Sequence, residues 1–247
     1  MSPLIPLFFS TALIYSMAGF GGGSTYLALL VLFQFPFQSI APMALICNVA
    51  VVSFGFWQFS KKGHFLFKKI FPFVVTSIPM AYWGGTISLG RKPFTLLLGI
   101  SLTAAALRLF WVNKPMEPLT SVSMRKIWLI GLPLGALLGF LAGLVGIGGG
   151  IYLAPVLLFL GWVDVKQAAA ASSFFILVNS LSGLMGQATK GPLSLPIEII
   201  LPLLFAVILG GQVGSRWGSG SLPKLALQRV TATLILWAAG RLLWGIA

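Results

Sequence analysis

Long apolar segments, separated only by short basic clusters, make up most of this 247-residue chain. They cover residues 4–35, 39–59, 70–89, 93–112, 127–161, 167–187, 195–215 and 223–246. Only 8% of the residues are charged, whereas a soluble domain carries about 25%. A water-soluble fold cannot bury this much apolar surface, and a membrane crossing needs about 20 apolar residues. The chain is therefore expected to be an all-α polytopic membrane protein.

The formal net charge of +13 would, in a soluble protein, suggest binding to nucleic acid. Here the basic residues lie in loops between apolar segments, as in Lys61-Lys62 and Arg91-Lys92, and such clusters are typical of cytoplasmic loops. We therefore expect membrane lipid, and no nucleic acid, as a partner. The chain contains one cysteine and one histidine, so no metal site and no cofactor are expected.

An internal repeat divides the chain into two halves. The run Gly19-Phe20-Gly21-Gly22-Gly23 recurs as Gly146-Ile147-Gly148-Gly149-Gly150, and Asn48, Pro72 and Pro93 have later counterparts in Asn179, Pro202 and Pro223. All these pairs occur in the same order, which chance does not readily produce. The sequence predicts a first repeat over residues 1–113, a linker over 114–126 and a second repeat over 127–247.

The first apolar segment of each repeat has an unusual length. As single helices, residues 4–35 and 127–161 would reach about 48 and 52 Å, whereas a hydrocarbon core is about 30 Å thick. Glycines also interrupt each segment near its middle. We expect each to form a re-entrant hairpin of two half-helices. Each repeat would then contain one hairpin and three transmembrane helices, at 39–59, 70–89 and 93–112 and at 167–187, 195–215 and 223–246.

The distribution of basic residues supports two inverted repeats. If each hairpin enters and leaves on one side, each half crosses three times and the halves have opposite orientations. Twelve basic residues then share one face: Lys61, Lys62, Lys68, Lys69, Arg108, Lys114, Arg125, Lys126, Lys166, Arg216, Lys224 and Arg229. The other face carries Arg91, Lys92, Lys190 and Arg241. The positive-inside rule then predicts a multi-pass protein of the inner (cytoplasmic) cell membrane with both termini outside the cytoplasm.

The two glycine runs are the strongest candidates for a binding site. A half-helix that begins at membrane depth presents unpaired N–H groups and the positive end of its dipole, and both favour an anion. One predicted anion cradle comprises Gly22, Gly23, Ser24 and Thr25, and the other comprises Gly149, Gly150, Ile151 and Tyr152. The alternative is that the glycines only allow helices to pack closely.

Polar residues within apolar segments supply further candidates. Asn48 and Asn179 are placed at equivalent depths by the repeat, and Ser173 lies in the same segment as Asn179. A buried amide needs a partner, so the asparagines are expected to bind the anion or brace the glycine turns. Bonds between helices, or from a serine to its own helix, are the alternatives. Asp164 is expected to cap the helix that follows it.

The glycine motifs also resemble a known family. Residues 143–155, together with Asp164 and the small-residue run 168–173, are similar to the TauE/SafE family of sulfite exporters and related permeases. The first-half motif, Gly19 to Leu30, follows the same pattern but has Ala28 where the second has Pro155. The resemblance extends over essentially the whole chain. It implies transport of sulfite, thiosulfate, sulfoacetate or a related sulfur-containing or organic anion, without specifying which.

These features together predict a secondary transporter that moves a small anion by alternating access. An anion channel or uniporter of the same fold is the alternative. An intramembrane serine hydrolase would need a base beside Ser24, and His64 and the lysines lie in loops, so no enzymatic activity is expected. The direction of transport, the coupling ion and the oligomeric state, including a homodimer, stay open.

Overall fold

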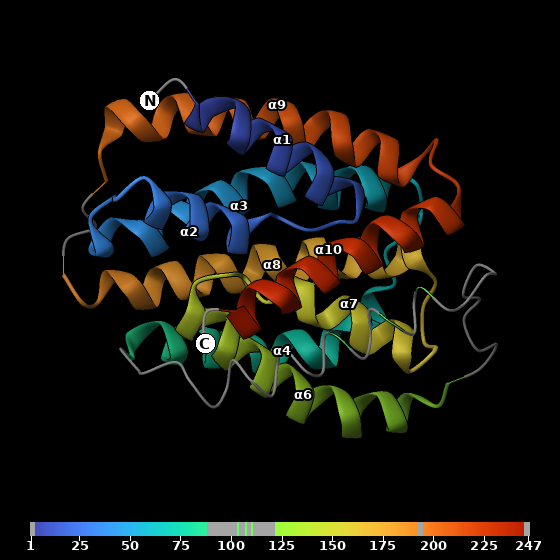
Figure 1. Cartoon of the computed structure of the whole chain (residues 1–247). Helices are drawn as coiled ribbons and strands as arrows, with labels where there is room; N and C mark the ends of the chain where they lie inside the picture. Colours follow the sequence, from blue (N-terminus) through green and yellow to red (C-terminus); the bar gives the residue numbers. More distant parts are fainter. Residues whose placement is uncertain are drawn as a thin grey trace.

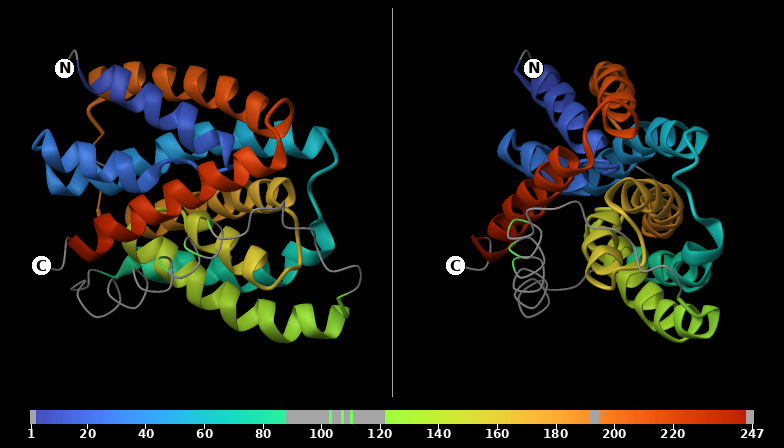
Figure 2. Two further views of the ribbon diagram at one scale, coloured as in Figure 1. Left: turned by 45° about the vertical axis from the view of Figure 1, so that its right-hand side comes forward. Right: turned by 90° about the vertical axis from the view of Figure 1, so that its right-hand side faces the viewer.

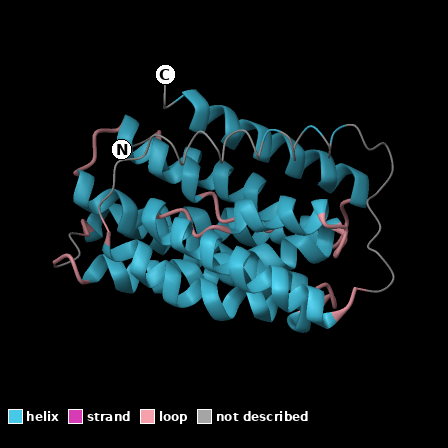
Figure 3. Cartoon of the chain, turned by 90° about the horizontal axis from the view of Figure 1, so that it is seen from below, coloured by secondary structure: helices cyan, strands magenta, loops and turns pink. Residues whose placement is uncertain are grey.

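The computed structural model describes residues 3–87, 103, 107, 110, 122–191 and 195–244, and this part of the chain is helical with no strand (Figures 1 and 3). The helices are α1 (Leu4–Met17), α2 (Gly23–Leu32), α3 (Phe37–Lys61), α4 (Phe67–Thr86), α6 (Met124–Val145), α7 (Gly150–Phe159), α8 (Val165–Ala188), α9 (Ile197–Ser219) and α10 (Lys224–Trp244). The predicted helix over 93–112, apart from three residues, and most of the linker lie outside the described residues.

Both predicted hairpins break at their glycines. α1 ends at Met17 and α2 begins at Gly23, while α6 ends at Val145 and α7 begins at Gly150. The arms are unequal, however, since α1 has 14 residues, α6 has 22, and α2 and α7 have 10 each. α6 is therefore about 33 Å long, enough to cross a bilayer, and is not the half-helix that was expected. It begins inside the predicted linker, at Met124, which accounts for three of its 22 residues.

Four of the described helices are long and apolar enough to cross a membrane. These candidate spans are Ser39–Lys61 in α3, Met124–Val145 in α6, Val165–Ala188 in α8 and Ile197–Ser219 in α9. The prediction of a polytopic all-helical membrane protein is therefore confirmed.

The helices form layers with α3 and α8 at the centre (Figures 1 and 2). α3 and α8 run antiparallel, because Gly55 of α3 meets Ser173 while the earlier residue Leu45 meets Gly183. α1 packs on α9 at one edge and α4 packs on α6 at the other, so each edge pair joins helices from different halves. α2 lies against α3, and α7 lies against α8.

Glycines bring the helices of both edge pairs into close contact. In α9, Gly210, Gly214 and Gly218 meet the backbone of Phe9, Leu13 and Met17 of α1. In α6, Gly135, Gly139 and Gly143 meet the backbone of Phe73, Ser77 and Ala81 of α4. A side chain at any of these glycines would collide with the partner backbone. Both pairs are parallel, since contacts advance along both helices together.

One end of the bundle carries most of the described basic residues. Lys166 and His64 bond the carbonyl oxygens of Gly220 and Ser219 at the end of α9, and Lys69 bonds that of Trp162 after α7. These contacts gather the ends of α3, α7 and α9 with the starts of α4 and α8. Basic groups there also satisfy helix C-terminal carbonyls, which carry partial negative charge.

Asp164 is the N-cap of α8, as predicted. Its carboxylate accepts a hydrogen bond from the Gln167 backbone N–H (2.8 Å), and the Gln167 side chain accepts one from the Asp164 N–H (3.0 Å). This reciprocal arrangement is a capping box, which satisfies two otherwise unpaired donors at the start of a helix.

We expect Asp164→Ala to lower the free energy of unfolding by about 1 kcal/mol, because the Gln167 N–H loses its acceptor. Asp164→Asn keeps a side-chain oxygen at the cap and should retain more of the stability. Chemical unfolding of the purified variants in detergent micelles measures both. Equal stability of Asp164→Ala and the unmodified protein would contradict a capping role.

Candidate functional site

The first glycine turn joins α1 to α2 through two left-handed residues. Gly19 has φ 76° and Gly22 has φ 87°, a backbone conformation that favours glycine. The chain turns sharply after α1, and α2 begins at Gly23. Within the described chain, the backbone N–H groups of residues 21–24 donate no hydrogen bond. The start of α2 therefore presents a set of free donors and the positive end of its dipole.

The second turn repeats this geometry between α6 and α7. Gly146 (φ 75°) and Gly149 (φ 76°) correspond to Gly19 and Gly22, whereas Gly148 (φ 79°) has no left-handed counterpart at Gly21. The N–H groups of residues 148–151 likewise donate no hydrogen bond within the described residues. Both predicted cradles thus have the free donors that an anion site requires.

Asn48, in the middle of α3, brings the two turns together. Its side chain lies against Gly21 and Gly23 of the first turn, where an added Cβ would collide with the amide. Its Nδ2 donates a hydrogen bond to the Ile147 carbonyl oxygen of the second turn (3.1 Å). The Asn48 side chain is fully buried, and its Oδ1 has no hydrogen-bond partner. The two sets of free donors therefore lie around one amide.

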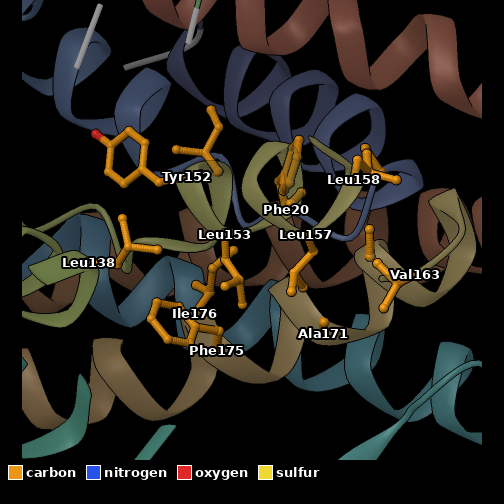
Figure 4. Packing of buried hydrophobic residues seen from close by; sticks show 14 of the residues in the cluster. Phe20, Leu138, Tyr152, Leu153, Leu157, Leu158, Val163, Ala171, Phe175 and Ile176 are labelled. Atoms are coloured by element: carbon orange, nitrogen blue, oxygen red, sulfur yellow. The ribbon is translucent and has the colours of Figure 1, made fainter. Parts of the chain in front are cut away.

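Two contacts brace the first turn from the second half. The Ser173 hydroxyl of α8 lies within hydrogen-bond distance of the carbonyl oxygens of Gly19 (3.0 Å) and Ala169 (2.9 Å), which share its single proton. The Phe20 side chain, 1% exposed, belongs to the same buried cluster as Leu157 of α7 and Ile176 of α8 (Figure 4). Each turn is thus held by side chains from the other half of the chain.

Among the described residues, the surroundings of the turns contain dipoles and no formal charge. In the described helices, every Lys, Arg, Asp and Glu lies within the first two or last two turns. Asn48 and Ile176, by contrast, each stand near the middle of their helices. Within the described helices, an anion at this position would therefore meet N–H and O–H groups and helix dipoles, and no charged side chain.

Comparison with known proteins identifies the family. The family described as "Sulfite exporter TauE/SafE" matches the chain over residues 4–242. The chain belongs to the TauE/SafE family.

Curated relatives support this assignment. The chain is 31% identical to the "Probable membrane transporter protein y4hK" of Sinorhizobium fredii over an alignment 249 residues long, gaps included, that covers 96% of each chain. A "Probable membrane transporter protein" of Methanocaldococcus jannaschii is 34% identical over 93 residues, covering 33% of this chain and 34% of the relative. YunE of Bacillus subtilis, with the same description, is 29% identical over 107 residues, or 43% and 38% of the two chains. No solved structure gives a significant match.

This TauE/SafE protein is therefore a multi-pass membrane transporter and not an enzyme. The sequence-based assignment to the family is confirmed.

The predicted site residues fall into groups with different surroundings. Gly22, Gly23, Gly149, Gly150 and Ile151 form the two turns and helix starts, and are buried. Ser24 is half-buried at the start of α2, and Tyr152 is buried in α7. The Thr25 hydroxyl donates to that of Tyr15 within the first hairpin (3.0 Å). Asn48 and Ser173 contact the turns directly.

Asn179 is not the structural counterpart of Asn48. Its Nδ2 donates to the Phe175 carbonyl of its own helix (2.8 Å), and its buried Oδ1 has no partner. The side chain that meets Gly148 and Gly150, as Asn48 meets Gly21 and Gly23, belongs to Ile176. The expectation that the repeat places the two asparagines at equivalent positions is wrong, although a contact of Asn179 with substrate remains a prediction.

The structure adds two polar residues that the sequence analysis did not select. The Tyr26 hydroxyl, buried and without a partner, lies 3.2 Å from where a Cβ on Gly22 would be. The Ser180 hydroxyl, also buried and unpartnered, lies 2.6 Å from the equivalent point on Gly148. Both are hydrogen-bond donors beside a turn. Tyr26 directly follows Thr25, and Ser180 directly follows Asn179, but neither the glycine motif nor the repeat distinguishes them in the sequence.

Proposed function

We propose that this transporter is a secondary carrier that moves a small sulfur-containing or organic anion, such as sulfite, thiosulfate or sulfoacetate, across the cytoplasmic membrane. The proposal rests on one observation: the free N–H groups of both broken hairpins meet around the buried Asn48 amide. Discontinuous helices that meet at mid-membrane form the substrate sites of many carriers. Gly22, Gly23, Ser24, Thr25 and their second-half counterparts Gly149, Gly150, Ile151 and Tyr152 would surround the anion.

The arrangement of the helices supports two inverted repeats. In such a repeat, α1 corresponds to α6, α3 to α8 and α4 to α9. The packing of α1 on α9 then corresponds to the packing of α6 on α4, and both pairs are present. At the turns, Gly19 packs on Ala169 and Gly146 on Ala41, alanines that are 128 residues apart. Because α3 and α8 are antiparallel, the two halves would have opposite orientations, with the basic end of the bundle in the cytoplasm.

Such a repeat offers a physical route to alternating access. Each edge pair joins one helix from each half through close backbone contacts at glycines, so each pair is expected to move as one unit. We expect the edge pairs to move against the central α3 and α8, and so expose the turns to one side at a time. A channel would require a continuous path instead. The test is the uptake of labelled substrate into proteoliposomes with and without unlabelled substrate inside. A carrier takes up label faster when substrate is present inside, and a channel does not.

The anion site predicts stabilisation by ligand. At 100 times its dissociation constant, a bound anion should stabilise the folded protein by about 2.7 kcal/mol. Thermal unfolding of the purified protein with sulfite, thiosulfate or sulfoacetate, against chloride at equal ionic strength, measures this. If none of the three raises the unfolding temperature above that in chloride, the proposed substrate class is wrong.

A further inference from the structure

The Oδ1 atom of Asn48 cannot form a hydrogen bond with a fully ionised oxyanion. Nδ2 is already bonded to the Ile147 carbonyl, and the unpartnered buried atom is Oδ1, which can only accept a hydrogen bond. A fully ionised oxyanion offers acceptors alone. It would pair with the free N–H groups of the turns and leave Oδ1 unsatisfied, which is costly in a buried site. The occupant therefore has to bring a donor of its own.

The charge of the surroundings limits the occupant as well. No Lys or Arg lies near the middle of the described helices, so these helices supply no cationic side chain at the depth of the turns to balance a bound anion. The cost of moving an ion out of water rises with the square of its charge, and dipoles compensate only part of it. A dianion is therefore disfavoured much more strongly than a monoanion.

We propose that the site binds a singly charged oxyanion that keeps one proton, and that Asn48 Oδ1 accepts the hydrogen bond from its O–H. This inference rests on the proposed function and narrows its substrate class: of the three anions named there it retains sulfite, and it excludes thiosulfate and sulfoacetate, which carry two negative charges and no acidic proton at neutral pH. The free N–H groups and the hydroxyls of Tyr26 and Ser180 would face the unprotonated oxygens. For sulfite the bound species is hydrogen sulfite, formed in solution on one side and deprotonated in solution on the other. A proton then crosses with the substrate, and no carboxylate in the membrane is needed to carry it.

A sodium ion is the other species that a free amide oxygen could bind. The neighbouring free groups argue against it, since the N–H groups of residues 21–24 and 148–151 and the positive ends of two helix dipoles repel a cation. Sodium-dependent binding of the anion at constant pH would overturn the proposal.

The test uses three anions on the purified protein, with affinity measured by thermal shift at a series of pH values. Sulfite changes from monoanion to dianion near neutral pH, methanesulfonate is a monoanion without an O–H group, and sulfate is a dianion throughout. We expect the apparent Kd for total sulfite to rise about tenfold per pH unit above the second ionisation of sulfite. Methanesulfonate should bind about tenfold more weakly than hydrogen sulfite, and sulfate at least about 100-fold more weakly.

Methanesulfonate also serves as the control for titration of the protein itself, because its charge does not change over this range. If its affinity falls with pH in parallel with that of sulfite, a protein group is responsible and the proposal is wrong. Sulfite binding that is constant or tighter at high pH, or sulfate binding as tight as that of sulfite, also overturns it while leaving the anion site intact. Failure of every anion to bind would instead contradict the proposed function.

A variant pair tests the role of the Asn48 oxygen. Asn48→Leu should reduce the preference for hydrogen sulfite over methanesulfonate from about tenfold to about onefold. Ser53→Ala is the matched control on the same helix, because the Ser53 hydroxyl donates to the Val49 carbonyl of its own helix. The control should keep the preference. An Asn48→Leu protein that also keeps it would remove Asn48 from proton recognition.

Discussion

Replacing Gly19 with alanine is expected to destabilise the folded protein by about 3 kcal/mol or more. Two costs combine at this position. The φ of 76° disfavours any residue with a Cβ, and an added methyl group would collide with the backbone of Ala169 in α8. Because that neighbour is helix backbone, it cannot move aside without displacing the central helix pair. Thermal and denaturant unfolding of the purified variant measure the loss.

Gly63 provides a matched control for this prediction. It has φ 75°, almost the same as Gly19, but lies in the loop after α3 with no atom within 4 Å of an added Cβ. Gly63→Ala should therefore show the conformational cost alone, about 1 kcal/mol. If Gly19→Ala is no more destabilising than Gly63→Ala, then the first turn does not pack against α8 as the structure describes.

The hairpins were predictable because their signal is local. Glycine runs in the middle of long apolar segments indicate helix breaks whatever the rest of the chain does, and both breaks occur there. The cap at Asp164 was predictable for the same reason. The packing of α1 on α9 and of α4 on α6 was not, because apolar and small residues on a lipid-facing helix do not specify which other helix they contact.

The error over Asn179 has a simple geometrical cause. The asparagines were paired because they are the same residue type at a similar offset, 131 residues. The contacts of the two turns follow an offset of 128, as Asn48 and Ile176 show. Three residues turn a helix by about 300°, so Asn179 points about 60° away from the position of Asn48 and lies about 4.5 Å further along. Identity of residue type is a weaker guide than register when helices pack.

The two halves differ at this position, which is Asn48 in the first half and Ile176 in the second. This difference leads to the second prediction with a large expected effect. Asn48→Ile should lower anion transport by about 100-fold, because the Ile147 carbonyl loses its donor and the amide between the turns disappears. Asn179→Val should have a smaller effect, since the amide nitrogen of Asn179 bonds the Phe175 carbonyl of its own helix. Counterflow of labelled sulfite in proteoliposomes measures both. Transport by Asn48→Ile at the unmodified rate would remove the amide from the site.

Combining Asn48→Ile with Ile176→Asn distinguishes a lost ligand from a damaged fold. The double variant moves the amide to the equivalent place in the second half, against Gly148 and Gly150. If the halves are related by inversion, the Phe20 carbonyl corresponds to the Ile147 carbonyl, and the relocated amide would donate to it. The free N–H groups of the two turns would then surround the amide as before. We expect transport to recover to within about tenfold of the unmodified protein. A double variant that folds, judged by its thermal unfolding, but transports no better than Asn48→Ile would mean that the two turns are not interchangeable.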